Sequence, residues 1–184
     1  MDIHDIKAKV RINAYVYTQP AEIERKADQL TFAQIEEALL NGETLEQYSD
    51  TGRGESCLIV GSPATHPFIS FAAGAVTEWQ SLLYTFRARR TLLIRGHAGR
   101  VPMRKVECNF CGSDRYEERR TDYLYSHKGS YLLVPNTPVE VCLNCGMIYY
   151  DAAVLKEIER RFFAIQRRDE QPDRYIEMPE KAYA

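Results

Sequence analysis

The stretch Cys108-Asn-Phe-Cys111-Gly112 and its repeat Cys142-Leu-Asn-Cys145-Gly146 decide how the second half of the chain folds. Two Cys-x-x-Cys pairs at this separation are a strong signal for zinc. A two-residue gap lets one tight turn aim two thiolates at a single ion, and two such turns complete a tetrahedron. A glycine after each pair suits a turn that needs a positive φ. Four thiolates fill the coordination of one structural zinc ion, so a catalytic zinc is not expected.

The composition sets the class of protein and its compartment. Apolar residues make up 45% of the 184 residues, and the net charge of −2 gives no global attraction to nucleic acid or anionic lipid. No apolar run approaches the roughly 20 residues of a membrane helix, and the polar N-terminus lacks a signal-peptide core. We therefore expect a cytoplasmic protein whose thiols stay reduced, which weakens a disulfide interpretation of the four cysteines.

The first half of the chain is expected to form helices followed by an antiparallel sheet, which is an α+β order. Apolar spacing predicts a helix over 2–12, and a short extended piece over 14–17 follows. Pro20 suits the first turn of a second helix over 21–28. Thr31 and Gln34 form a capping-box pattern that opens a third helix, and Gly42 ends it. Alternation of apolar and polar residues then predicts strands over 43–49, 56–60, 68–72 and 82–87.

The second half is expected to contain a four-cysteine zinc-ribbon hairpin followed by a long helix. Strands over 115–125 and 130–141 lead the chain from the first cysteine pair to the second. Asp151 opens a helix over 151–168 with an apolar stripe made of Val154, Leu155, Ile158, Phe162 and Ile165. The stripe is too long for a small ribbon to cover. We expect it to pack on the first domain or on a second copy, and it is the predicted partner-binding surface.

A basic stretch joins the two halves. Its basic residues, with no acidic residue among them, are Arg87, Arg89, Arg90, Arg95, Arg100, Arg104 and Lys105. Glycine and proline mark 96–105 as a linker between domains 1–95 and 106–184. Residues 1–86 carry six basic and twelve acidic side chains. The stretch is therefore either a strip that contacts nucleic-acid phosphates or a solvated linker that pairs with the acidic first domain.

The features of the second half follow one another in a specific order. Two cysteine knuckles enclose a hairpin with tyrosine and lysine, Tyr149-Tyr-Asp151 leads into a helix, and Pro172-Asp-Arg-Tyr-Ile-Glu-Met-Pro closes the chain. In this order residues 106–184 resemble the YgiT-type zinc finger family. The resemblance implies an antitoxin-like module that binds structural zinc and grips a cognate ribonuclease toxin. The best-known antitoxin of that family has a helix-turn-helix after its zinc module, whereas this chain has one helix and a tail, so DNA binding is not implied.

Residues 1–95 carry a second, more distant resemblance. The residues that support it are Asp28, Thr31, Ile35, Glu36, Ala38-Leu-Leu-Asn-Gly42, Leu58-Ile-Val-Gly61, His66-Pro67 and Tyr84-Thr-Phe86. They resemble a small domain family of unassigned function that is distantly related to the RelE-like ribonuclease toxins. That family commonly has histidines where this chain has Pro20 and Ile69. Because general acid–base cleavage needs groups that move a proton, the resemblance implies a degenerate toxin-like domain.

Three functions are consistent with these patterns. The favoured one is a zinc-binding regulatory protein of the toxin–antitoxin type, whose zinc module masks a toxin-like domain in the same chain or in a partner. The first alternative is a metal-independent endoribonuclease that uses Tyr84, Arg87, Lys26 and His66, with Arg87 stabilising charge on the phosphate. The second alternative is a zinc-ribbon protein that binds nucleic acid through the basic strip 87–105.

Overall fold

The computed structural model describes residues 2–48, 56–63, 69–74, 89–93, 108 and 110–179. Within them the helices are α1 (Ile3–Arg11), α2 (Gln19–Ala27), α3 (Phe32–Asn41) and α4 (Ala152–Arg167). The strands are β1 (Val16–Thr18), β2 (Glu43–Tyr48), β3 (Ser56–Gly61), β4 (Ile69–Gly74), β5 (Arg89–Leu93), β6 (Tyr116–His127), β7 (Ser130–Cys142) and β8 (Ile148–Asp151). The fold is therefore mixed α/β, with the helices and the long hairpin close to their predicted positions. None of the helices in the described part of the chain is both long and apolar enough to span a membrane.

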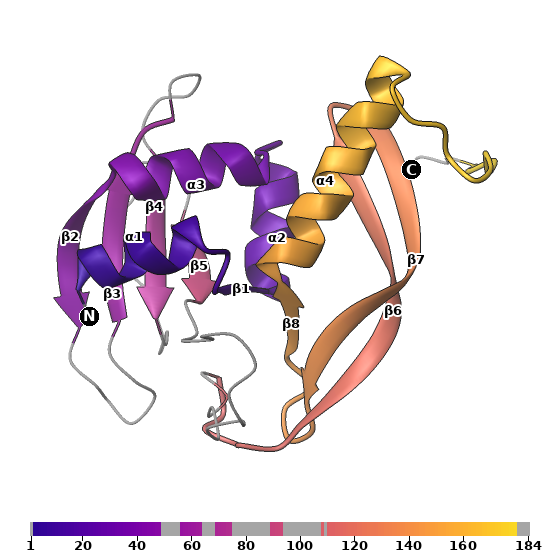
Figure 1. Cartoon of the computed structure of the whole chain (residues 1–184). Helices are drawn as coiled ribbons and strands as arrows, with labels where there is room; N and C mark the ends of the chain where they lie inside the picture. The colour runs from indigo at the N-terminus through magenta and orange to yellow at the C-terminus, as the bar shows by residue number, and fades with distance from the viewer. Residues whose placement is uncertain are drawn as a thin grey trace, which may run out of the picture.

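One sheet joins the two halves of the chain (Figure 1). Its strand order is β2-β3-β4-β5-β1-β8-β7-β6. The junction is the antiparallel pair β1–β8, which sets Tyr17 opposite Tyr150. Segments 1–95 and 106–184, which the sequence predicts as two domains, therefore contribute strands to one sheet.

The helix ends follow the signals read from the sequence. The Thr31 hydroxyl accepts a bond from the Gln34 backbone N–H at 3.1 Å, and the Gln34 side chain accepts one from the Thr31 N–H at 2.9 Å. This reciprocal pair is the predicted capping box. The Asp151 carboxylate accepts a bond from the Ala153 N–H at 2.7 Å and opens α4. Local hydrogen bonds thus mark where α3 and α4 begin.

Helix α3 lies very close to strand β3 because two glycines leave room for it. A Cβ at Gly61 would lie 1.9 Å from the Ala38 carbonyl oxygen, and a Cβ at Gly42 would lie 2.7 Å from the same atom. Any side chain at Gly61 would therefore force the helix away from the strand. Both glycines are among the residues that carry the distant family resemblance, and this close approach is a physical reason for their presence.

Two strand expectations need correction. The structure forms β5 over Arg89–Leu93, inside the stretch predicted as a basic strip, and it forms β8 over Ile148–Asp151, which was not expected as a strand. The sheet is also not wholly antiparallel, because β5 runs parallel to β4. A parallel neighbour needs a crossover of a dozen or more residues, which the interval between these strands supplies. The strand predicted over 82–87 lies outside the described residues.

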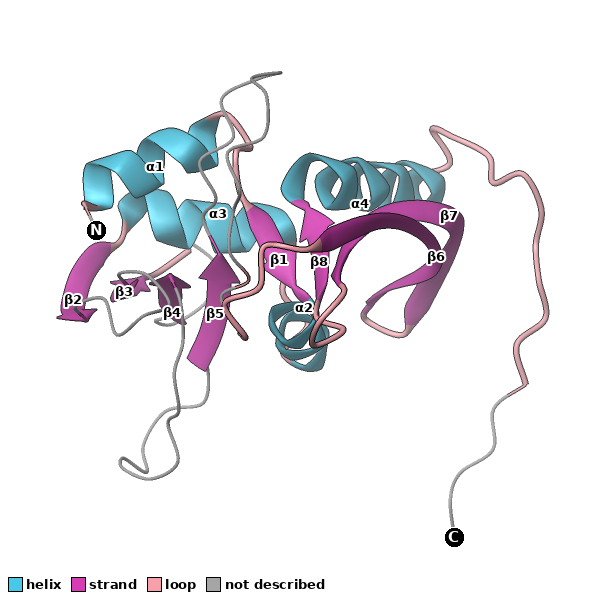
Figure 2. Cartoon of the chain, turned by 90° about the horizontal axis from the view of Figure 1, so that it is seen from below, coloured by secondary structure: helices cyan, strands magenta, loops and turns pink. Residues whose placement is uncertain are grey.

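The core is built from both halves. Aromatic rings of both halves pack in a row. The ring centroids of Tyr17 in β1 and Phe32 in α3 are 5.0 Å apart, and Phe32 lies 6.3 Å from Tyr125 of β6. Tyr125 lies 4.7 Å from Phe162 of α4. In Figure 2, helices α1, α3 and α4 follow one another along the same side of the sheet. The buried residues of the α4 stripe thus share one core with residues of the first half and of the hairpin of the same chain.

Candidate metal centre and domain junction

The four cysteines of the two knuckles converge on one point. Their Sγ atoms all lie within 4.8 Å of one another. Cys108 and Cys145 are 3.7 Å apart at sulfur, and Cys111 and Cys142 are 3.6 Å apart. A tetrahedral ion with metal–sulfur bonds near 2.3 Å requires sulfur separations of about 3.8 Å, whereas a disulfide requires about 2.05 Å. The donor set therefore fits a single metal ion and excludes disulfides in this arrangement.

The two knuckles have the same backbone geometry. The Gly112 N–H donates to the Cys108 carbonyl at 2.7 Å, and the Gly146 N–H donates to the Cys142 carbonyl at 2.9 Å. Both glycines have a positive φ, 73° and 74°, as expected from their place in the repeat. A third bond, from the Leu143 N–H to the Arg115 carbonyl at 3.0 Å, ties one knuckle to the chain after the other. The site is preformed by the backbone as well as by the cysteines.

The thiols have unequal environments. Burial works against ionisation of Cys108, but a hydrogen bond from Tyr149 and backbone N–H groups outweigh it and lower its pKa to about 6. Although Cys145 is exposed, partial desolvation of its sulfur and then the neighbouring thiols raise its pKa to about 12. Four close thiols resist joint ionisation, and a bound cation reverses this by stabilising every thiolate. This donor set therefore suits a divalent metal with a preference for sulfur.

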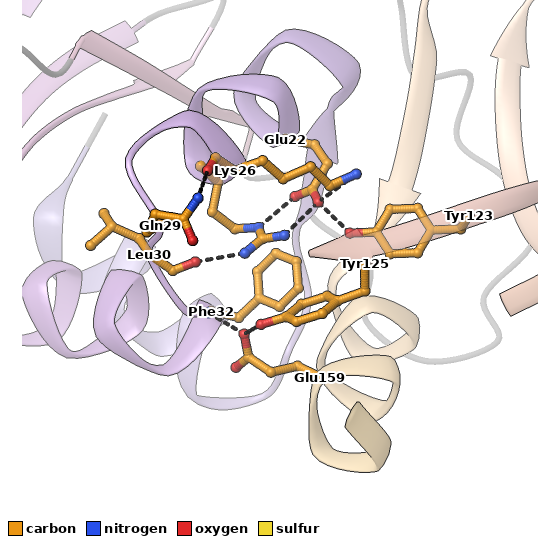
Figure 3. Close-up of polar contacts among 9 residues, drawn as sticks. Glu22, Lys26, Gln29, Leu30, Phe32, Tyr123, Tyr125 and Glu159 are labelled. Atoms are coloured by element: carbon orange, nitrogen blue, oxygen red, sulfur yellow. Dashed lines mark hydrogen bonds and ion pairs between the residues drawn. The ribbon is translucent and has the colours of Figure 1, made fainter. Parts of the chain in front are cut away.

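A second cluster lies at the junction of the two halves, where Glu22, Tyr123 and Glu159 come from different elements (Figure 3). Arg25 of α2 belongs to this cluster and is fully buried. Its guanidinium donates twice to the Glu22 carboxylate at 2.8 Å and once to the Leu30 carbonyl at 2.6 Å. The same group lies over the rings of Phe32 and Tyr125, 4.4 Å and 4.8 Å from their centroids. A buried charge is tolerated only when it is paired and hydrogen-bonded, and Arg25 satisfies both conditions.

Glu22 is shared between the two halves. The Tyr123 hydroxyl of β6 donates to its carboxylate, and the Lys26 amine lies 3.5 Å from the same carboxylate. The Lys26 amine also lies 4.5 Å above the Tyr123 ring. Burial raises the pKa of the Tyr123 hydroxyl and the charge on Glu22 raises it further, so this group remains a donor. Strand β6 thus supplies a hydrogen bond that the first half cannot make alone.

Glu159 of α4 forms the other side of the junction. Its carboxylate accepts bonds from the backbone N–H groups of Phe32 and Ala33, at 2.8 Å and 3.4 Å, in the first turn of α3. It also accepts a bond from the Tyr125 hydroxyl at 2.6 Å. A carboxylate at a helix N-terminus pairs with orphan donors and with the helix dipole. A residue of the second half therefore caps a helix of the first half.

A third link lies nearer the surface. The Lys156 amine of α4 donates to both oxygens of Glu36, at 2.9 Å and 2.8 Å, and to the side-chain oxygen of Asn13 at 2.7 Å. The Tyr15 hydroxyl donates to Glu36 at 2.6 Å. Partly exposed ion pairs contribute little individually. This link fixes orientation rather than supplying much of the stability of the junction.

Acidification is expected to weaken the packing of the hairpin on α4 through His127. This side chain is 9% exposed, packs edge-on against Phe163 at 5.5 Å, and its Nδ1 has no hydrogen-bond partner in the described part of the chain. Burial first, then the charges of Lys128 and Arg25, lower its pKa. The unfolded chain therefore takes up the proton first, so this contribution to stability is complete above about pH 6.5 and declines below it.

The measurement is the urea midpoint of the wild type and of His127→Phe, taken near pH 7.5 and near pH 5.5. The variant should lose less stability on acidification than the wild type. Both proteins retain the same cysteines, so acid effects on the metal centre cancel in the comparison. An equal loss in the two proteins would show that His127 does not carry this pH dependence.

Of the four residues predicted to be catalytic, Lys26 lies in the described part of the chain, at the junction beside Glu22. Tyr84, Arg87 and His66 lie outside the described residues.

The apolar stripe of α4 is largely covered. Leu155, Ile158 and Phe162 are buried in the chain's own core, and Val154 and Ile165 are partly buried. A partner-binding role for this stripe stays a prediction, and it would require α4 to leave that core.

The predicted nucleic-acid strip is described only in part. Arg89 and Arg90 lie in β5, opposite Ser70 and Phe71 of β4. The other members, which lie outside the described residues, are Arg87, Arg95, Arg100, Arg104 and Lys105.

Sequence reasoning missed the junction residues. Glu22 and Arg25 look like an ordinary helix-surface pair at i,i+3, and Glu159 looks like another charge on the polar face of α4. The available signal was the placement of tyrosines at alternate positions of β6, Tyr123 and Tyr125, because buried phenols need polar partners. Those partners are Glu22 and Glu159.

Comparison with known proteins bears on the first half alone. Residues 17–82 match the model of a family described as Domain of unknown function (DUF4258). Comparison with curated proteins and with solved structures gave no match. The matched residues run from β1 through β4 and so include α2 and α3 of the junction. The region similar to a described family is therefore the N-terminal one, and the cysteine module lies beyond it.

Proposed function

We propose that the chain is a zinc-binding regulatory protein of the toxin–antitoxin type, in which a YgiT-like zinc module masks a RelE-like region of the same chain. The observation that supports this is the junction, where β8 and α4 of the module bind β1 and α3 of the first half. Glu159 caps α3 across this junction, and Tyr123 completes the hydrogen bonding of Glu22. The contact resembles the interface of an inhibitor with its target more than a flexible linkage between domains.

Zinc has a structural role in this proposal. Cys108, Cys111, Cys142 and Cys145 would hold the ion and close its coordination. Strand β8 begins shortly after Cys145 and continues directly into α4. A fixed second knuckle therefore sets the direction in which both elements leave the metal centre. The module would use zinc to present β8 and α4 to the first half, in a cytoplasm that keeps the thiols reduced.

The surroundings of Lys26 favour masking over catalysis. Its amine is held between the Glu22 carboxylate and the Tyr123 ring, and burial lowers its pKa. A cation that pairs with this carboxylate and this ring is less available to stabilise a phosphate, although 28% of the Lys26 side chain stays exposed. If Lys26 belongs to an ancestral ribonuclease site, the module covers it.

A split-chain experiment tests the proposal. Residues 1–105 and 106–184 are expressed together as two chains, with an affinity tag on the second, in medium that contains zinc. They should co-purify as a complex, because the junction consists of non-covalent contacts that do not depend on the linker. Recovery of a soluble tagged module without the first segment would contradict the proposal.

A matched pair of variants makes the test specific. Glu159→Lys reverses the charge at the α3 cap and should abolish co-purification. Glu157 lies on the same helix and, among the described residues, pairs only with arginines of α4. The control substitution Glu157→Gln should therefore leave the complex intact. Growth arrest with RNA cleavage on release of residues 1–105 would identify an active endoribonuclease.

A further inference from the structure

Tyr149 of β8 connects the metal centre to the sheet. Its side chain is 1% exposed, and its hydroxyl lies 3.1 Å from the Sγ of Cys108. A buried phenol requires a polar partner, and a thiolate can accept a hydrogen bond from it. Cys108 is itself buried, so water does not reach this ligand as it reaches the exposed Cys145.

The environment of Tyr149 holds the hydroxyl in place. Its ring packs edge-on against Tyr116 with centroids 5.8 Å apart. Its backbone is paired on both sides, with Thr18 of β1 and with Glu140 of β7. Tyr149, Cys108, Cys142 and Val16 of β1 also form one small buried cluster. The phenol therefore has little freedom to turn away from the sulfur.

The hydroxyl breaks the symmetry of the two knuckles. Each first cysteine donates its N–H to a carbonyl beyond its turn, Cys108 to Ser113 at 2.7 Å and Cys142 to Met147 at 2.9 Å. The backbone N–H groups of Cys108 and Cys142 therefore make equivalent hydrogen bonds. The Tyr149 contact distinguishes Cys108 from Cys142, which points to a role at one ligand rather than to general packing.

We propose that Tyr149 is a positioning residue of the metal centre, whose hydroxyl donates to the Cys108 thiolate and retards loss of the ion. This inference rests on the proposed metal binding. A hydrogen bond to a ligating sulfur fixes its orientation and reduces its excess negative charge, and outer-shell groups of this kind typically change metal affinity by about 10–100-fold. Because Tyr149 is also paired with Thr18, it links retention of the ion to the β1–β8 junction.

The test uses the full chain loaded with cobalt(II), which reports thiolate ligation through its charge-transfer bands. Tyr149→Phe keeps the ring and removes the hydroxyl. It should weaken cobalt binding, measured by competition with a chelator, by about 10-fold or more and shift the charge-transfer bands. Tyr150→Phe is the matched control, because neighbouring residues of a strand point to opposite faces and Tyr150 packs on Tyr123 instead. Tyr150→Phe should match the wild type in cobalt affinity and in its charge-transfer bands.

Two results separate the possible failures. If wild type binds cobalt with thiolate bands and Tyr149→Phe matches it in affinity and spectrum, the role of Tyr149 is overturned while metal binding stands. If wild type shows no thiolate–cobalt bands, the proposed metal binding is itself wrong.

A measurement on the wild type alone also tests the hydrogen bond from Tyr149 to Cys108. Wild type loaded with cadmium-113 should show a scalar coupling between the metal and the Tyr149 hydroxyl proton, and a resolved hydroxyl resonance without this coupling would overturn the inference.

Discussion

Removal of the metal is expected to unfold the first half of the chain together with the cysteine module. The intact protein should unfold in one cooperative transition that includes helices α1 to α3. Chelation of the metal, or the substitution Cys142→Ser, should abolish this unfolding transition because the chain is then already unfolded. In zinc-finger peptides the apparent binding free energy of structural zinc is about 10–16 kcal/mol. The whole stability of a domain is only about 5–15 kcal/mol. Loss of the ion therefore has the largest effect expected for this chain.

The physical reason is that the first half has no complete core of its own. Phe32 and Tyr17 pack on Tyr125 and Phe162 through a chain of ring contacts, and β1 needs β8 to pair its second edge. A metal-free module that releases β8 would expose the aromatic rings of the first half and the edge of β1. The sequence alone favoured a different result, in which residues 1–95 survive chelation as an independent domain.

Far-UV circular dichroism against urea, with and without a zinc chelator, measures this effect. Cys57→Ala is the control, because Cys57 is buried in β3 outside the metal centre. It should lower the urea midpoint but retain the metal and the single transition. A helical signal from α1 to α3 that persists after chelation would contradict the prediction.

Arg25→Met is expected to cost about 3–5 kcal/mol of unfolding free energy, which is the second-largest effect. The substitution keeps much of the side-chain volume but removes the charge that pairs with Glu22. The Glu22 carboxylate, only 2% exposed, would then be buried without its main partner. The Leu30 carbonyl would also lose its donor. The urea midpoint of metal-loaded protein measures the loss.

The double variant Glu22→Gln/Arg25→Met tests the cause. Neutralising both members removes the uncompensated charge, so the double variant should be more stable than Arg25→Met alone. Both proteins should bind the same amount of metal at saturation, because both keep the four cysteines unchanged. A double variant that is less stable than the single one would show that shape, rather than charge pairing, dominates at this site.

The features predicted correctly are those written in short stretches of sequence. Thr31 and Gln34 specify a capping box, Asp151 specifies the start of α4, and the two knuckles specify the convergence of their cysteines. Each signal acts over a few residues, so no knowledge of the rest of the fold is required. The lengths of β6 and β7 followed in the same way from alternation and from the turn between them.

The features that were missed depend on residues far apart in the chain. Pairing of Tyr17 with Tyr150 joins strands of three and four residues, which carry little periodic signal of their own. Strand β5 was obscured because two arginines at its start resemble a solvated charge run. The burial of Arg25 could not be read from α2, since charged residues are almost never fully buried unless paired. The groups that make its burial possible come from α3 and β6 as well as from its own helix.

Hydrogen–deuterium exchange of the full chain, with and without the metal, tests most directly whether the module and the first half form one unit. The decisive amides are those of Phe32, which donates to Glu159, and of Tyr17 in β1. We predict that both are protected when the metal is bound, and that both exchange as fast as the amides of β8 when it is removed. Amides of Phe32 and Tyr17 that stay protected after metal removal, while β8 exchanges freely, would contradict the account.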